Sequence, residues 1–147
     1  VLPPWHANIG KRQVRSPKVY VADSGMLHAL LGITTRDELF GHPKSGASWE
    51  GFALQEVIRR IGARPEDCYF WATHGGAELD LVVLRGDRRL GFEVKHTTAP
   101  RTTRSQRSAL ESLELEELVV VHAGSASFRL DEHIRAVALA DLAREIS

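Results

Sequence analysis

Two acidic residues and a lysine occur in two short apolar segments that a tight turn joins. Segment 78–85 (ELDLVVLR) contains Asp80. Segment 88–95 (RRLGFEVK) contains Glu93 and Lys95. Carboxylate oxygens are ligands that Mg²⁺ and Mn²⁺ prefer, and a neighbouring ammonium group can balance the charge that develops on a phosphate. These residue types therefore indicate a candidate site for metal-assisted chemistry.

The turn between the two segments predicts how they pair. Its residues are Gly86 and Asp87, and a two-residue loop with glycine first is typical of a type II′ hairpin. The flanking segments are rich in Val, Leu and Phe, so they are predicted to form antiparallel strands over 78–85 and 88–95. Counting outward from the turn places Asp80 opposite Glu93 in this hairpin.

The predicted pairing brings charged groups to one face of the sheet. Side chains alternate between the faces with a period of two, so Asp80, Glu93 and Lys95 share one face. The other face then carries apolar residues: Leu79, Leu81 and Val94. Directly paired residues have Cβ atoms about 4.5–5.5 Å apart, and opposed like charges destabilise a sheet. Two such carboxylates require a cation between them, or a proton retained on one of them.

A third acidic residue lies on a predicted helix. Ser48 is a good N-cap, and the helix that follows it is predicted to end at Gly62. At about 100° per residue, Glu50 falls within the apolar stripe formed by Leu54, Val57, Ile58 and Ile61. A carboxylate on a buried stripe is costly unless it is paired or binds a cation. Alternatively, Glu50 only complements the helix dipole; the hairpin carboxylates favour a functional role.

Length and composition limit the possible functions. The 147 residues suffice for one domain that buries about two-thirds of its unfolded surface. Lys+Arg and Asp+Glu each number 19, so binding of DNA or RNA would require a local basic patch. The single Cys68 excludes an internal disulfide and a cysteine-rich zinc site, and we expect it to be a buried thiol. No apolar run approaches the ~20 residues of a membrane span and no signal peptide is evident, so we expect a cytoplasmic protein without a membrane partner.

The N-terminal residues carry turn formers and basic side chains. Residues 1–17 contain three prolines and a glycine, so we expect a linker or tail from a missing upstream region. Basic residues cluster in this stretch and just after it: Lys11, Arg12, Arg15 and Lys18. A solvated linker is favoured for them over contact with phosphates. The segment 18–147 is then the folded domain.

The remaining elements follow from apolar patterning, caps and turn residues. Strands are predicted at 18–22, 68–73 and 116–123, with a possible short edge strand at 125–130. Helices are predicted from Asp23 or Ser24 to about Leu31, at about 104–115 and at about 137–146, whereas 32–47 is expected to be mainly loop. From Ser48 onward the order is helix, three strands, helix, strand. An antiparallel meander of three strands, joined in parallel by a fourth after a helical crossover, gives an α/β fold with a mixed central sheet flanked by helices.

This αβββαβ order, with its acidic residues, resembles the PD-(D/E)XK nuclease superfamily over residues 48–122. Glu50 lies on the first helix, Asp80 on the second strand, and Glu93-Val94-Lys95 on the third. The proline of the family motif is absent, since Leu79 precedes Asp80. The resemblance implies a restriction-endonuclease-like fold and hydrolysis of phosphodiester bonds in DNA or RNA.

The resemblance also implies roles for individual residues. Asp80, Glu93 and the carbonyl of Val94 would hold Mg²⁺ (or Mn²⁺). Lys95 would orient or deprotonate the attacking water and offset charge in the transition state. Glu50 would bind a second metal ion or position water.

A closer likeness extends over the whole chain. The segments that carry it are PPWHANIGKRQVRSPKVYVADSGMLHALLG, GASWEGFALQEVI, YFWATHGGAELDLVV and GFEVKHT. They are similar to the C-terminal domain, of unassigned function, in a group of prokaryotic AAA+ ATPases. This likeness implies an upstream ATPase domain as a partner within the full-length chain. The present sequence has no G-x-x-x-x-G-K-[ST] motif, so ATP would bind only in that missing domain.

Four residues after the hairpin are weaker candidates for binding nucleic acid: Arg101, Arg104, Gln106 and Arg107. The superfamily resemblance makes Gln106 a possible auxiliary contact, although a surface glutamine is the simpler interpretation. The three arginines have helical spacing and could grip phosphates or form a solvated face. His74 and His96 could lie at the edge of the site, or be polar loop residues.

A second function stays open, namely a catalytically silent nuclease-fold domain that regulates or targets the upstream ATPase. The balanced charge fits this interpretation, because phosphate binding depends on clustered Lys and Arg. The intact set of Glu50, Asp80, Glu93 and Lys95 favours an active site. Related nucleases often work as dimers, so a homo-oligomer is possible.

Overall fold

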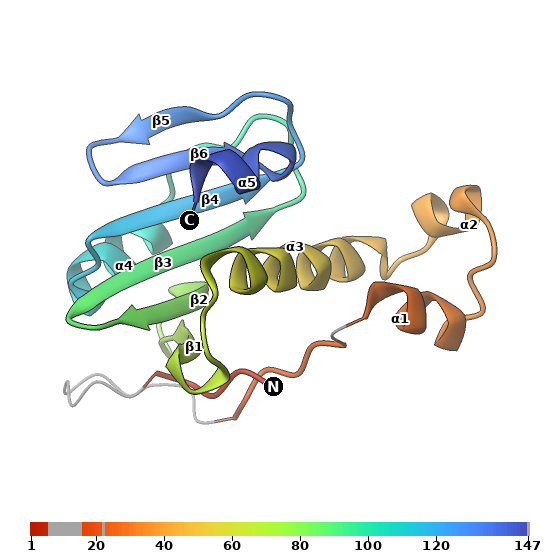
Figure 1. Cartoon of the computed structure of the whole chain (residues 1–147), viewed down its shortest axis with the longest axis horizontal. Helices are drawn as coiled ribbons and strands as arrows, with labels where there is room; N and C mark the ends of the chain where they lie inside the picture. Colours follow the sequence, from red (N-terminus) through yellow and green to blue (C-terminus); the bar gives the residue numbers. More distant parts are fainter. Residues whose placement is uncertain (6–15, 22, 147) are drawn as a thin grey trace.

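The computed structural model describes residues 1–5, 16–21 and 23–146. Its centre is a six-stranded mixed sheet with strand order β1-β2-β3-β4-β6-β5 (Figure 1). The strands are β1 Cys68–Ala72, β2 Glu78–Arg85, β3 Arg88–Lys95, β4 Glu117–His122, β5 Phe128–Asp131 and β6 Ile134–Ala138. The meander β1-β2-β3 is antiparallel, β4 joins β3 in parallel, and β6 joins β4 in parallel. The predicted α/β fold with a mixed sheet is confirmed.

Helices cover both faces of the sheet (Figure 1). One face is covered by α3 Ser45–Ile61 and the short α5 Leu142–Glu145, and the other by α4 Arg104–Leu113. Two helices, α1 Ser24–Leu30 and α2 Arg36–Gly41, lie beyond the N-terminal end of α3. The 3-10 turns Pro65–Asp67 and Leu139–Asp141 complete the regular structure.

Each face has its own apolar cluster. The α3 side contains Leu54, Val57, Leu81, Phe92, Val94, Val119 and Val121. The α4 side contains Leu79, Val82, Ala109, Leu113, Leu118, Val120 and Ile134. The central strands therefore bury side chains on both faces, which explains why β4 reads as a continuous apolar run rather than an alternating one.

The hairpin that carries the candidate residues has the predicted bounds and turn. Gly86 has a φ of +67°, as the first position of a type II′ loop requires. The ladder runs from the pair Arg85–Arg88 to the pair Leu81–Phe92, in the predicted register.

The predicted face of Leu79 is wrong. Tyr69 pairs with Val82 and Trp71 pairs with Leu79, so three residue steps in β2 face two steps in β1. This β-bulge adds one residue to β2 and reverses the alternation of side chains beyond it. Leu79 therefore packs on the α4 side, while Leu81 packs on the α3 side.

The first helix of the motif begins earlier than predicted. Helix α3 starts at Ser45, and Lys44 at its N-cap makes no side-chain capping hydrogen bond. Ser48 is therefore a buried residue inside the helix rather than its cap. The predicted end is correct, because Gly62 closes α3 with a left-handed φ of +62°. The segment expected to be mainly loop, 32–47, contains α2 and the first residues of α3.

Two other predicted elements are wrong. Lys18 forms only an isolated bridge with Leu2, and residues 19–21 are not a strand; residue 22 lies outside the described residues. The helix expected at about 137–146 is only partly present: its first two residues belong to β6, residues 139–141 form a 3-10 turn, and only Leu142–Glu145 form the helix α5. The strand β6, which pairs with β4 from Leu118–Ile134 to His122–Ala138, was not predicted. β6 lies between β4 and β5 and is buried on both faces, so it lacks the alternation that identifies a half-buried strand.

The chain's first residues lie against the edge strand β1. Leu2 is buried in the α3-side cluster, and the amide of Trp5 donates to the carbonyl of Phe70 at 2.7 Å. The basic residues Lys11, Arg12 and Arg15 lie outside the described residues. Among the described helices, none is long and apolar enough to cross a membrane.

Candidate functional site

Asp80 lies where β2 separates from β3. The pairs between these strands end at Leu81–Phe92, one step before Asp80 and Glu93. Instead, Oδ2 of Asp80 accepts a hydrogen bond from the amide of Val94 at 2.9 Å. Asp80 is only 7% exposed. The carboxylate thus takes the place of a backbone acceptor and is fixed at the point where the two strands part.

Glu93 is buried on the α4 side of β3 and both of its carboxylate oxygens have partners. Oε2 accepts a hydrogen bond from Nε2 of Gln106 at 2.6 Å, and Oε1 lies 2.6 Å from Nζ of Lys95. Gln106 is fully buried, so the interpretation as a surface glutamine is wrong. Gln106 therefore contacts Glu93, and its contact with nucleic acid stays a prediction.

The capping box of α4 explains how Gln106 is held in this position. Thr103 Oγ1 accepts from the amide of Gln106 at 3.2 Å, and Oε1 of Gln106 accepts from the amide of Thr103 at 2.9 Å. The Gln106 oxygen is thereby used by the helix cap, and its Nε2 is left to donate to Glu93. The start of α4 therefore orients the Glu93 carboxylate.

Burial and like charge act on Asp80. Burial raises its pKa from the ordinary 3.8 to about 6; the Val94 amide and Lys18 oppose this shift, whereas Glu50 and Glu93 add to it. Any cation that comes close to Asp80 therefore stabilises the charged form of its carboxyl group. Strong perturbation by desolvation and neighbouring charges is common at functional sites.

Lys95 is a charged partner of the acidic pair. Burial alone lowers its pKa, but the hydrogen bond to Glu93 and the charges of Glu93, Asp80 and Glu78 outweigh burial, so the pKa is raised overall. Its side chain is 46% exposed and can reach a ligand at the surface. In this arrangement Lys95 is an ammonium group, suited to orienting a water molecule or a phosphate rather than to removing a proton.

Two residues beside the acids, Lys18 and Tyr20, were not predicted as part of the site. Nζ of Lys18 lies 3.7 Å from Oδ1 of Asp80 and 3.7 Å from Oε2 of Glu78. Tyr20 is partly buried next to Glu50, and burial, then the charges of Glu50, Asp80 and Glu78, raises its pKa. The alternation Lys-Val-Tyr at 18–20, with Val19 exposed, was the available signal: in an extended segment it puts both polar side chains on one side.

The donor set fits a metal ion held by two carboxylates. Within the described residues, no three His, Cys, Asp or Glu side chains are close enough to hold one ion, so Glu50 does not complete a three-acid cluster with Asp80 and Glu93. Mg²⁺ usually needs only one or two carboxylates, with waters and substrate phosphate as the other ligands. A carboxylate has about four lone-pair sites, so the contacts that Asp80 and Glu93 make leave acceptor capacity for an ion.

The weaker candidates, three arginines and two histidines, lie at the surface. Arg101 precedes α4, Arg104 begins it, and Arg107 lies 3.6 Å from Asp131 in an exposed ion pair. Phosphate contact by these residues stays a prediction. His74 is exposed in the turn between β1 and β2. His96 is exposed directly after Lys95.

The buried thiol expected at Cys68 is confirmed. Cys68 is 1% exposed in β1, and burial raises its pKa to about 11. The thiolate form is therefore disfavoured, and the residue is part of the packing rather than of a reactive site.

Two protein-family models match this chain, and the residues of the candidate site lie within them. Residues 45–142 match the model described as domain of unknown function (DUF4143), and residues 1–37 match domain of unknown function (DUF8612). The uncharacterized proteins Rv2008c of Mycobacterium tuberculosis and Mb2031c of Mycobacterium bovis are each 49% identical over 136 residues. The alignment covers 92% of this chain and 30% of each relative, so the chain spans less than a third of their length. The acids and Lys95 lie in the first matched segment, whereas Lys18 and Tyr20 lie in the second.

Proposed function

The chain belongs to the family described as domain of unknown function (DUF4143), and on this premise we propose that it is a metal-dependent nuclease domain. Its substrate would be DNA or RNA, and its ion Mg²⁺ or Mn²⁺. The observation that carries the proposal is the buried pair Asp80 and Glu93 at the fork of β2 and β3, with Lys95 bound to Glu93. The order α3-β1-β2-β3-α4-β4 supports the likeness to PD-(D/E)XK nucleases.

The energetics of the acidic pair favour a cation-binding role. A shift of the Asp80 pKa from 3.8 to about 6 corresponds to about 3 kcal/mol of unfavourable free energy for the charged form at neutral pH. An asparagine could accept the same hydrogen bond from Val94 without that penalty. A carboxylate at this position is understandable if its charge binds an ion, because functional sites often retain such destabilising groups.

Each residue of the site would have a separate role in phosphodiester hydrolysis. A bound Mg²⁺ would supply Lewis-acid stabilisation of a phosphate oxygen and a more acidic water. Asp80 and Glu93 would hold the ion, and Gln106 would keep the Glu93 carboxylate in place. The Lys95 ammonium would orient the attacking water and offset the charge on the phosphate. Glu50, outside the pair, would position water or a second ion.

The test is cleavage of plasmid DNA, single-stranded DNA and RNA with Mg²⁺ or Mn²⁺. We expect wild type to cleave at least one of them, and Asp80→Asn and Lys95→Met to lose the activity. Asp87→Asn is the matched control, because it removes an exposed carboxylate from the turn of the same hairpin. Absence of cleavage with every divalent ion and every form of nucleic acid, or an equally active Asp80→Asn, would refute the proposal.

We further propose that the domain works as the C-terminal part of an AAA+ ATPase-type protein. The whole-chain likeness described above supports this context, and the matched relatives are longer than the matched segment. ATP binding and any coupling to the nuclease site would belong to the other domain. Co-purification of the domain with separately expressed upstream segments of a full-length relative would test the association.

A second function, a silent regulatory module, is favoured by one observation. Lys18 and Lys95 already neutralise part of the charge of Asp80 and Glu93, which reduces the need for an ion at this position. Calorimetric titration with Mg²⁺ and Mn²⁺ discriminates between the two functions. A silent module would bind neither ion, or would bind without cleavage.

A further inference from the structure

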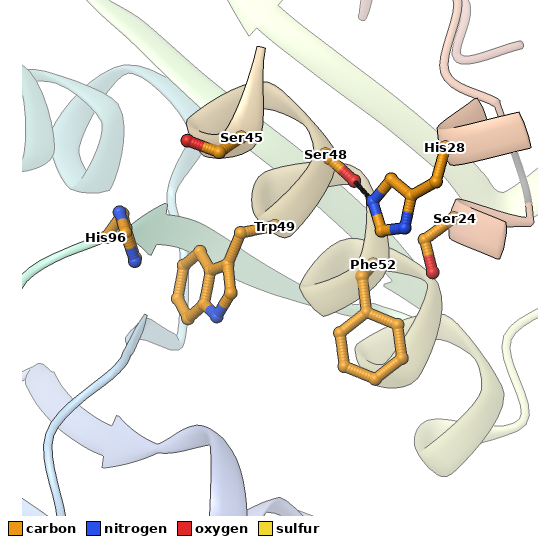
Figure 2. Close-up of a pocket in the computed structure, with 7 residues that line it drawn as sticks. All are labelled: Ser24, His28, Ser45, Ser48, Trp49, Phe52 and His96. Carbon is orange, nitrogen blue, oxygen red and sulfur yellow. Dashed lines mark hydrogen bonds between the residues drawn. The ribbon is translucent and has the colours of Figure 1, made fainter. Parts of the chain in front are cut away.

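A cavity of about 280 Å³ lies between α1, the first half of α3 and the segment that follows β3 (Figure 2). It is lined by Ser24, His28, Ser45, Ser48, Trp49, Phe52 and His96, and its surface is mostly apolar. This volume is near the lower end of the ~300–1,000 Å³ typical of small-molecule sites. It therefore suits a single ring system rather than an extended ligand.

Four rings line the cavity, those of His28, Trp49, Phe52 and His96. The centroids of the Trp49 and His96 rings are 5.2 Å apart, and their planes are inclined at 40°. Phe52 lies on the same face of α3 as Trp49, and Figure 2 shows the Phe52 ring in the cavity next to Trp49. Phe52 is 43% exposed, which leaves much of its apolar surface in water. A flat aromatic ligand could cover this surface by stacking or edge contacts.

Hydrogen-bonding groups lie along one wall. Nε2 of His28 and Oγ of Ser48 are 2.7 Å apart, and Figure 2 shows this pair beside Phe52 and Ser24. Hydroxyl and imidazole groups both donate and accept hydrogen bonds. An apolar cavity with a few such groups matches the mixed edge of a nucleobase, whose faces are apolar and whose rim carries donors and acceptors.

The position of the cavity connects it to the proposed nuclease site. Trp49 directly precedes Glu50 on α3, and His96 directly follows Lys95, the last residue of β3. The ring-binding residues are therefore neighbours in sequence of two of the charged residues. Successive side chains of a strand point to opposite faces of the sheet, so a nucleic-acid strand with a phosphate at Lys95 and a base at Trp49 and His96 would pass around the end of β3.

We propose that this cavity binds one unpaired nucleobase, so that the substrate is single-stranded nucleic acid or a strand with an unstacked nucleotide. The inference rests on the proposed nuclease function and specifies its substrate class. A base inside a duplex is stacked and paired on both sides and cannot enter a cavity of this kind unless it is flipped out. Stacking on aromatic side chains is the usual way in which proteins hold unpaired bases.

The test measures binding without cleavage. A fluorescently labelled single strand of about 12 nucleotides, the same strand with abasic sites, and a duplex are titrated with the full chain in EDTA, and anisotropy is recorded. Phe52→Ala and Trp49→Ala should weaken binding of the single strand about 5- to 150-fold, as expected for the loss of one stacked base. Phe128→Ala is the matched control, because Phe128 on β5 is also 43% exposed and does not line the cavity. It should bind like wild type.

The outcomes separate this inference from the nuclease proposal. Preference for the intact strand over the abasic strand and the duplex, lost in Phe52→Ala but kept in Asp80→Asn, supports the inference. Equal binding of intact and abasic strands, or no effect of Phe52→Ala, overturns it even if wild type cleaves nucleic acid. Absence of any binding also overturns it, while the cleavage assay decides separately on the Asp80 site. Circular dichroism of Trp49→Ala checks its folding, and Phe52→Ala provides the test if Trp49→Ala is unfolded.

Discussion

Replacing Asp80 with asparagine should make the stability of the protein depend differently on pH. Asparagine has the same shape, and its Oδ1 can still accept the hydrogen bond that Val94 donates to Asp80 at 2.9 Å. What the substitution removes is a buried negative charge. Because burial raises the Asp80 pKa to about 6, the folded protein binds a proton at this site more tightly than the unfolded chain does.

The direction and the size of the effect follow from that shift. For wild type, the penalty of the charged Asp80 is fully present above pH ~6 and disappears as the pH falls towards 3.8, the ordinary value. About two pKa units correspond to about 3 kcal/mol. Asparagine also leaves an amide NH₂ without a known partner, at about 1–3 kcal/mol, and loses a weak contact with Lys18. The amide term does not depend on the Asp80 proton, and the Lys18 contact is already included in the pKa shift. The stability difference between variant and wild type should therefore change by about 3 kcal/mol between pH ~4 and pH ~7.5.

Urea unfolding followed by tryptophan fluorescence at a series of pH values measures this difference. Asp80→Asn should gain about 3 kcal/mol relative to wild type as the pH rises from about 4 to about 7.5. Asp87→Asn, in the exposed turn of the same hairpin, should show no comparable gain. A constant difference for Asp80→Asn, or one that falls as the pH rises, would refute the explanation based on desolvation of Asp80.

Three further predictions follow from the contacts around the site. Gln106→Ala leaves the buried Glu93 carboxylate without its 2.6 Å partner and should lower the free energy of unfolding by about 1–3 kcal/mol in urea titrations; an unchanged value would mean that the contact is not stabilising. Lys18→Met removes a cation 3.7 Å from Asp80 and should tighten Mg²⁺ binding in calorimetry, whereas weaker binding would refute competition between Lys18 and the ion for Asp80. Gly91→Ala would place a Cβ 2.6 Å and 2.9 Å from two leucine side chains and should cost about 1–3 kcal/mol; a neutral thermal melt would show that the core adapts freely.

Local signals explain what could be predicted. The bounds of β2 and β3, the Gly86 turn and the register from Arg85–Arg88 inward depend on residues close together in the chain, and turn chemistry fixes them. The start of α4 near residue 104 and the end of α3 at Gly62 are likewise local. A two-residue period relates Glu93 to Lys95 within β3, whereas the position of Asp80 also depends on the bulge and on the end of the ladder at Leu81–Phe92.

The sequence by itself determined the hairpin and the order of elements from α3 through β4. The tertiary structure alone decided the bulge that turns Leu79 to the α4 side, the pairing of β6 with β4, and the approach of Lys18 to Asp80. It also decided the contact of Gln106 with Glu93. The physical reason is that these features depend on which distant segments share a face of the sheet, and burial against a distant neighbour overrides the local periodicity from which elements are predicted.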